Sequence, residues 1–130
     1  MRFDVVSLFP DLFRILAGQG VVGRALERGI AELHLWNPRD YTRDPHRTVD
    51  DRPYGGGPGM VMKMAPLQAA IENAKRLAPD SEVAYVTPQG RTLVQDAIAR
   101  IAAKPGWILI AGRYEAVSYT HLTLPTNREV

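Results

Sequence analysis

Apolar and polar positions alternate along the chain in a pattern that predicts strands and helices in turn. Residues 3–9 (FDVVSLF) are typical of a β-strand, and Pro10 then stands where a helix tolerates proline, in its first turn. Two short helices follow, the second over residues 21–28, and glycines end both. Residues 30–36 alternate again, which predicts a second strand.

The second half of the chain repeats this alternation. Helical spacing of apolar residues predicts a helix over residues 67–77, and residues 83–86 (VAYV) indicate a strand buried on both faces. Thr92 and Gln95 predict a capping box for a further helix, with its apolar residues at 94, 97, 98 and 101 buried. Residues 107–111 (WILIA) form the most hydrophobic strand. The whole pattern predicts an α/β fold, a mostly parallel sheet flanked by helices.

Residues 37–63 interrupt this pattern with a long segment of little periodicity. Loops of that length are usually functional or disordered. The stretch 50–60 (DDRPYGGGPGM) holds four glycines and two prolines, a composition that suits a shaped loop with accessible backbone amides. It is neither a P-loop nor a dinucleotide-binding motif. A solvated loop of turn residues therefore remains open as an alternative, because the segment's five basic and four acidic residues nearly balance.

Composition narrows the class further. The 130 residues suit one domain, and 45% hydrophobic with 23% charged residues is ordinary for a globular protein. A net charge of +2 permits nucleic-acid binding without arguing for it. No cysteine is present and the three histidines lie far apart, so we expect no metal site. No 18-residue apolar run occurs, and early acidic residues argue against a signal peptide, which predicts a cytoplasmic protein without membrane contact.

Two turns follow apolar strands directly, at residues 87–90 and 112–115. In open α/β sheets, ligands bind outside the carboxyl ends of the strands. Both turns are therefore candidate binding loops, although ordinary connections between a strand and a helix would look the same.

Six motifs stand together in an order and spacing that resembles one family. They are SLFP at 7–10, GRA at 23–25, PRD at 38–40, HRTVDDRPYGGGPGM at 46–60, PQGR at 88–91 and GRYE at 112–115. Over roughly residues 1–116 the chain resembles the bacterial tRNA (guanine-N1)-methyltransferases, which methylate guanine 37 beside the anticodon. The resemblance implies a SPOUT-like, trefoil-knotted methyltransferase fold, a homodimer, tRNA as substrate and S-adenosylmethionine as methyl donor.

The resemblance also implies two sets of site residues. The cofactor-binding set comes from loops at strand ends and comprises Tyr85, Val86, Thr87, Pro88, Gln89, Gly90, Gly112, Tyr114 and Glu115. The RNA-binding set comes from the long segment and comprises Arg43, His46, Arg47, Asp50, Arg52, Gly55 and Gly59. In this second set, arginines would hold phosphates while Asp50 or Asp51 accepts hydrogen bonds from a splayed-out guanine.

The chain departs from the family after residue 116. Ala116 stands where the family has glycine, and residues 117–130 carry no family motif. We interpret 1–116 as a partial S-adenosylmethionine-binding domain and 117–130 as an artefactual tail, with a genuine short tail as the alternative. The family's base and its partner arginine lie beyond the matching region, and no catalytic residue is assigned. We expect an incomplete knot, exposed apolar surface that favours self-association or poor solubility, and no activity by the fragment alone.

Two other functions remain open. One is a binding module that holds S-adenosylmethionine or RNA without catalysis. The other is a generic nucleotide-binding α/β domain, which is the weaker reading because no Lys, Ser or Thr accompanies the glycines to bind phosphate.

Overall fold

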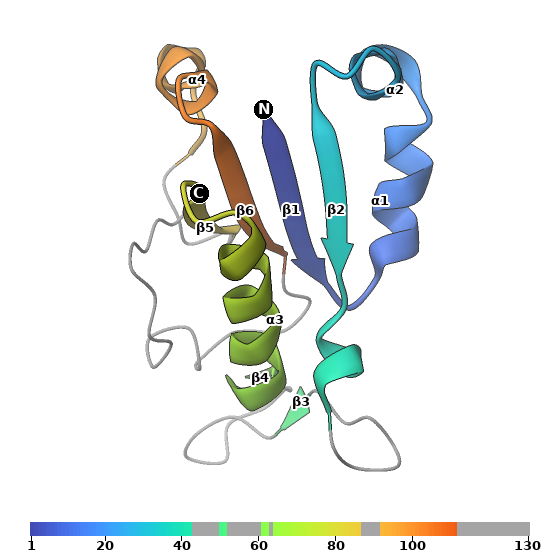
Figure 1. Cartoon of the computed structure of the whole chain (residues 1–130), viewed down its shortest axis with the longest axis vertical. Helices are drawn as coiled ribbons and strands as arrows, with labels where there is room; N and C mark the ends of the chain where they lie inside the picture. Colours follow the sequence, from blue (N-terminus) through green and yellow to red (C-terminus); the bar gives the residue numbers. More distant parts are fainter. Residues whose placement is uncertain (43–49, 52–60, 63, 87–91, 112–130) are drawn as a thin grey trace.

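The computed structural model describes residues 1–42, 50–51, 61–62, 64–86 and 92–111. Its centre is a four-stranded sheet with the strand order β2-β1-β6-β5. The strands are β1 (Arg2–Ser7), β2 (Glu32–Trp36), β5 (Glu82–Val86) and β6 (Gly106–Ala111). All neighbouring pairs are parallel, so the carboxyl ends of the strands meet at one edge of the sheet (Figure 1).

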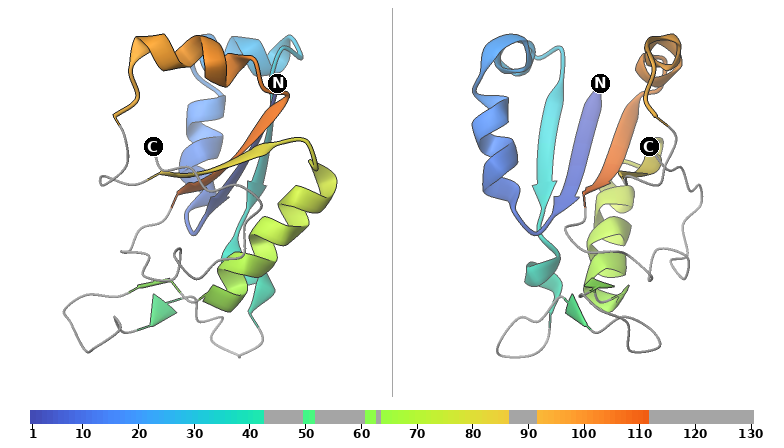
Figure 2. Two further views of the ribbon diagram at one scale, coloured as in Figure 1. Left: turned by 90° about the vertical axis from the view of Figure 1, so that its left-hand side faces the viewer. Right: turned by 180° about the vertical axis from the view of Figure 1, so that it is seen from behind.

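Helices lie on both sides of this sheet (Figure 2). On one side, α1 (Pro10–Ala17) and α2 (Gly20–Glu27) form a hairpin in which α1 contacts β1 and β2. On the other side, α3 (Met64–Leu77) packs against β1 and β6. The last helix, α4 (Gln95–Ala102), lies beyond the amino end of β6 (Figure 1).

The core lies between the sheet and α3. Ten buried side chains form it: Val6, Leu8, Leu67, Ala70, Ile71, Ala74, Val83, Tyr85, Ile108 and Ile110. The strand predicted to be the most hydrophobic, β6, is central in the sheet, and its Ile108 and Ile110 are completely buried. The α/β class and the parallel sheet predicted from the sequence are therefore confirmed.

Parts of the long segment after β2 are regular. A short 3-10 helix, η1 (Pro38–Tyr41), packs along α3. The two-residue strands β3 (Asp50–Asp51) and β4 (Val61–Met62) form an antiparallel pair. Figure 1 shows η1 and this pair beyond the carboxyl edge of the sheet, next to the start of α3. Hydrophobic periodicity could not reveal such short elements.

Two predictions for α4 are wrong. The helix begins at Gln95 with Val94 as its N-cap, and no side chain caps it. Gln95 is thus the first helical residue, whereas a capping box needs it at the third. The expected buried face is also absent, because Val94 is 52% and Ile98 40% exposed. The helix lies at the end of the sheet rather than on its face, so its apolar side chains have no sheet beneath them.

Candidate functional site

The first part of the site is the pair of strand ends from which the predicted cofactor loops begin. Ala111, the last residue of β6, pairs with Val86 of β5 on one side and with Ser7 of β1 on the other. The connections that follow Val86 and Ala111 therefore start side by side at one edge of the sheet. This is the position at which parallel sheets bind ligands.

Two of the predicted cofactor-binding residues belong to the described part of the chain. Tyr85 is 7% exposed and its ring belongs to the hydrophobic core, so it forms the wall behind the strand end. Val86 is 46% exposed and offers an apolar surface at the edge. The remaining members of the set lie outside the described residues: Thr87, Pro88, Gln89, Gly90, Gly112, Tyr114 and Glu115.

A hollow of about 540 Å³ opens at the same edge, between the start of α1 and the end of β2. Apolar Leu8 and Leu35 line it together with the polar residues Asp11, Asn37 and Asp40. Its volume lies in the range of small-molecule pockets. Among the described residues that line it, Arg14 is the only basic one, and it is paired with Asp11, so this lining does not suit a phosphate.

The second part of the site is the region that holds the predicted RNA-binding segment. The side chain of Asn37 caps η1 by accepting a hydrogen bond of 3.0 Å from the backbone N–H of Arg39. At the other end of η1, the Thr42 hydroxyl donates a bond of 2.8 Å to the carbonyl of Arg39. Further along, Asp50 pairs with Met62 in the β3–β4 ladder.

Of the predicted RNA-binding residues, only Asp50 lies in a described element, β3. The others fall outside the described residues: Arg43, His46, Arg47, Arg52, Gly55 and Gly59. The elements that flank them, η1 and α3, pack on each other. The start and the end of this long segment are thus held against the same helix.

Tyr41, the last residue of η1, packs against the hydrophobic core. Burial raises the pKa of its phenol above the ordinary value, and the nearby Asp40 carboxylate raises it further, against a lowering effect of Arg76. The phenol is therefore neutral at physiological pH and acts here as a packing group rather than as a base.

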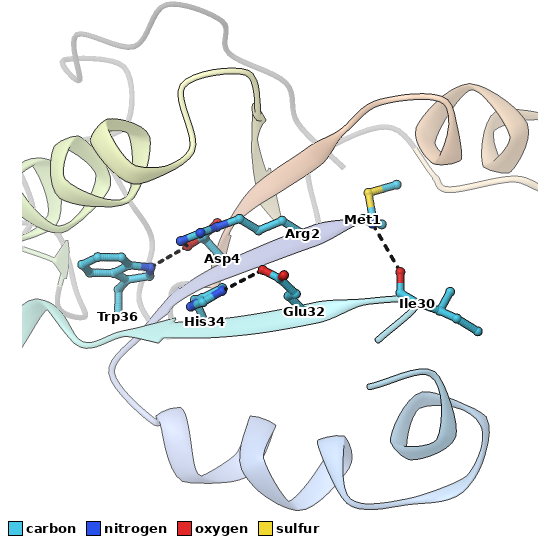
Figure 3. A network of polar contacts seen from close by, with 7 residues as sticks. All are labelled: Met1, Arg2, Asp4, Ile30, Glu32, His34 and Trp36. Atoms are coloured by element: carbon cyan, nitrogen blue, oxygen red, sulfur yellow. Dashed lines mark hydrogen bonds and ion pairs between the residues drawn. The ribbon is translucent and has the colours of Figure 1, made fainter. Parts of the chain in front are cut away.

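A buried polar network on β1 and β2, which no motif in the sequence indicated, surrounds Asp4 (Figure 3). Asp4 is completely buried and accepts two hydrogen bonds from the guanidinium of Arg2, at 2.9 and 3.1 Å. It accepts a third from the indole N–H of Trp36, at 2.8 Å. The hydrogen bond to Asp4 is the main cause that raises the pKa of Arg2, and burial opposes it. One sequence feature could have indicated this network: an acidic residue, Asp4, lies inside an apolar strand two positions after an arginine.

Two kinds of feature are absent from the part of the chain that the structure describes. No group of three or more His, Cys, Asp or Glu residues stands close enough to hold a metal ion there. In the same residues, no helix has the length and apolar character needed to cross a membrane.

Comparisons with known proteins agree on one family. The family model for "tRNA (Guanine-1)-methyltransferase TrmD" matches residues 1–129. A tRNA (guanine-N(1)-)-methyltransferase of Methylococcus capsulatus is 61% identical over 118 residues, which cover 90% of this chain and 47% of the relative. The enzyme of the same name from Herminiimonas arsenicoxydans is 48% identical over 135 residues, covering all of this chain and 54% of the relative.

A solved structure agrees with the fold. The crystal structure of a tRNA (m1G37) methyltransferase from Aquifex aeolicus superimposes with a TM-score of 0.83 at 32% identity. The superposition covers 92% of this chain and 54% of that one. The chain thus spans about half the length of the proteins that it matches.

Proposed function

Because the chain belongs to the tRNA (guanine-1)-methyltransferase family, we propose that it serves the transfer of a methyl group from S-adenosylmethionine to N1 of guanine 37 in tRNA. The observation that carries the proposal is the family match over residues 1–129. Fold likeness to a tRNA (m1G37) methyltransferase supports it, since the superposition covers 92% of this chain with a TM-score of 0.83. We also propose a cytoplasmic location, where tRNA is modified.

We assign the cofactor site to the carboxyl ends of β5 and β6 and their following loops, residues 85–90 and 112–115. Its fit to S-adenosylmethionine rests on two adjacent strand ends and the exposed apolar surface of Val86, which suits a flat, neutral adenine. When bound, the cofactor supplies the methyl group. The carboxylate of Glu115 would stabilise its cationic sulfonium, and glycines 90 and 112 would allow close backbone approach.

We assign tRNA recognition to residues 43–59. Arg43, His46, Arg47 and Arg52 would hold phosphates of the anticodon loop. Asp50 would accept hydrogen bonds from N1–H and the amino group of the guanine, and Gly55 and Gly59 would let the backbone approach the base. Supporting this, η1, β3 and β4 lie beyond the carboxyl edge of the sheet, the edge at which β5 and β6 end (Figure 1). Cofactor and base would then meet at one edge.

Methyl transfer to guanine N1 requires a base, because N1 carries a proton at neutral pH, and a cation to stabilise the charge that develops at O6. No described residue is assigned either role, and we propose that residues 1–116 hold the two ligands while the 130-residue chain does not turn over alone. The tail 117–130 has no role in this proposal.

We further propose a homodimer, in which the exposed apolar face of α1 and α2 is covered. Leu12, Ile15 and Leu16 lie on one face of α1 by their spacing, and Val21 and Val22 begin α2 beside them. These five side chains are between 56% and 73% exposed, and apolar patches of this kind favour association. Ile15→Lys should shift the chain toward monomer in sedimentation. If the wild type sediments as a dimer and Ile15→Lys sediments at the same rate, this face is not the dimer interface.

A labelled-methyl assay tests the proposed function. The enzyme is a chimera of residues 1–116 and the remaining half of the Methylococcus capsulatus relative, and the substrates are tRNA transcripts with guanine or adenine at position 37. We expect transfer only to the guanine transcript and only by the chimera. Transfer by the 130-residue chain alone would contradict the proposed lack of turnover. A folded chimera that binds both ligands and methylates neither transcript would contradict the proposed function.

The role of Asp50 has its own test in the same chimera. Asp50→Ala removes the proposed acceptor for the guanine and should weaken tRNA binding or lower the single-turnover rate. Affinity for S-adenosylmethionine should stay unchanged, because Asp50 is not among the residues assigned to the cofactor. An unchanged single-turnover rate would remove Asp50 from the recognition set.

A further inference from the structure

The Asp4–Trp36 contact joins the middle of β1 to the end of β2. In the parallel register, Trp36 stands opposite Val6, whereas Asp4 stands opposite His34. The indole therefore reaches back along the sheet face to donate its 2.8 Å hydrogen bond (Figure 3). The acceptor is fixed in turn, because Arg2 holds both of its oxygens. A completely buried carboxylate with three donors is a rigid anchor for the side chain that closes β2.

What this anchor holds in place is η1. Trp36 directly precedes Asn37, the N-cap of η1, and both Trp36 and Tyr41 pack against the hydrophobic core. Pro38, within η1, is buried. The short helix is thus fixed at its start by the indole and at its end by the phenol ring.

The segment that begins after η1 is the one assigned to tRNA. In the chain it follows η1 and precedes β4 and α3, and η1 packs on α3. A shift at the end of β2 would therefore move η1 relative to α3, and with it the position from which the segment begins. We expect β5 and β6 to stay in place, because β1 separates them from β2 in the strand order.

We propose that Asp4 and Trp36 are positioning residues for tRNA recognition, acting through η1 on the segment 43–60. The inference rests on the proposed role of that segment, and it names the two residues that fix the position from which the segment begins. Neither residue touches the substrate in this proposal. Their contribution is to restrict where the segment starts, which lowers the entropy lost when tRNA binds.

The fold offers a matched control for the test. Trp107 is also a buried tryptophan, 5% exposed, and its indole donates a 2.9 Å hydrogen bond to the carbonyl of Ile101. Trp36→Phe and Trp107→Phe thus each remove one indole N–H of similar geometry and keep an aromatic ring. Only the first removes a contact next to η1.

Two measurements on the 130-residue chain decide the matter. Hydrogen exchange should become faster at amides of η1, β3 and β4 in Trp36→Phe, and stay unchanged there in Trp107→Phe. The dissociation constant for an unmodified tRNA transcript should rise in Trp36→Phe by up to about tenfold, the most that the loss of one hydrogen bond can pass on to binding, and little in Trp107→Phe. The affinity for S-adenosylmethionine should be the same in both.

Several results would overturn the proposal. Unchanged exchange in η1 would show that the contact anchors nothing, and equal losses of tRNA affinity in both variants would reduce it to general stability. Faster exchange without weaker tRNA binding would separate the anchor from recognition. If Trp36→Phe does not fold, Asp4→Asn removes the charge of the acceptor and must give the same pattern. If the wild-type chain binds no tRNA, the proposed role of the segment fails, while the exchange data still judge the anchor.

Discussion

Substituting Leu67 by alanine is the sharpest test of the core between α3 and the sheet. Leu67 is completely buried in the cluster that joins α3 to β1, β5 and β6. Leucine-to-alanine changes at such sites lose the transfer free energy of the side chain and leave a cavity, at a cost of about 3–5 kcal/mol. A domain of this kind is stable by roughly 5–15 kcal/mol, so the variant should fold but be much weakened.

The same helix provides the control. Leu77, the last residue of α3, is 61% exposed. Its replacement by alanine forfeits only a fraction of the roughly 1.5–3 kcal/mol that full burial of a leucine is worth, so we expect a loss below about 1 kcal/mol.

Urea unfolding, followed by the fluorescence of Trp36 and Trp107, measures both variants. With an m value of about 2 kcal/mol/M, Leu67→Ala should lower the urea midpoint by about 1.5–2.5 M, whereas Leu77→Ala should lower it by less than about 0.5 M. Equal losses in the two variants, or a loss below about 1 kcal/mol at Leu67 with unchanged m, would refute the assigned packing of α3.

Two further predictions concern single groups. Gly106→Ala should lower the free energy of unfolding by about 1–3 kcal/mol, because a Cβ there would collide with the Ser81 hydroxyl and lie 2.8 Å from the carbonyl oxygen of Arg2. Gly18→Ala is the control, because the nearest contact of its Cβ would be 3.7 Å, and it should cost clearly less in the same urea assay. The reverse order would contradict the packing of β6 on β1. Tyr41→Phe should change the pH dependence of stability above about pH 10. The raised pKa means that the folded state holds the phenol proton more tightly, so wild-type stability is complete below the unfolded pKa and falls as pH rises through the folded one. The phenylalanine variant lacks this loss of stability at high pH. If the free energies of unfolding of the two proteins change in parallel from about pH 8 to 11, the prediction is wrong.

The strands and the helix over the core could be predicted because burial imposes a period on them. Residues 107–111 are apolar without interruption, and they belong to β6, an inner strand of the sheet that pairs with β1 and β5 and packs against α3. The apolar positions of α3 recur at helical spacing for the same reason. Most predicted boundaries fall within about three residues of the observed ones.

Other features depend on tertiary context that no local pattern encodes. The apolar residues of α4 have helical spacing, yet Ile98 stays 40% exposed because the helix lies past the end of the sheet. Asp4 is the converse case, a charged residue that is buried. An aspartate by itself predicts an exposed position, but Arg2 and Trp36 donate three hydrogen bonds to it that make burial possible. Asn37 and Pro38 are helix-start residues, but η1 was too short for periodicity to reveal.

The sequence pattern could predict where in the fold the candidate site lies, but not which residues contact a ligand there. An alternating pattern of strands and helices predicts that loops at the carboxyl ends bind ligands, and Val86 and Ala111 do end adjacent strands. The roles of Glu115 and Asp50 came from resemblance to a family, because a glycine-rich loop with balanced charge does not identify its ligand by itself.

The central claim is that residues 1–116 carry a site for S-adenosylmethionine at the ends of β5 and β6. Calorimetric titration of the 130-residue chain with S-adenosylmethionine tests it most directly. We expect saturable binding of one ligand per chain in the micromolar range, weakened when Glu115 is replaced by glutamine. Absence of binding heat from a chain shown to be folded by its urea transition would contradict the claim.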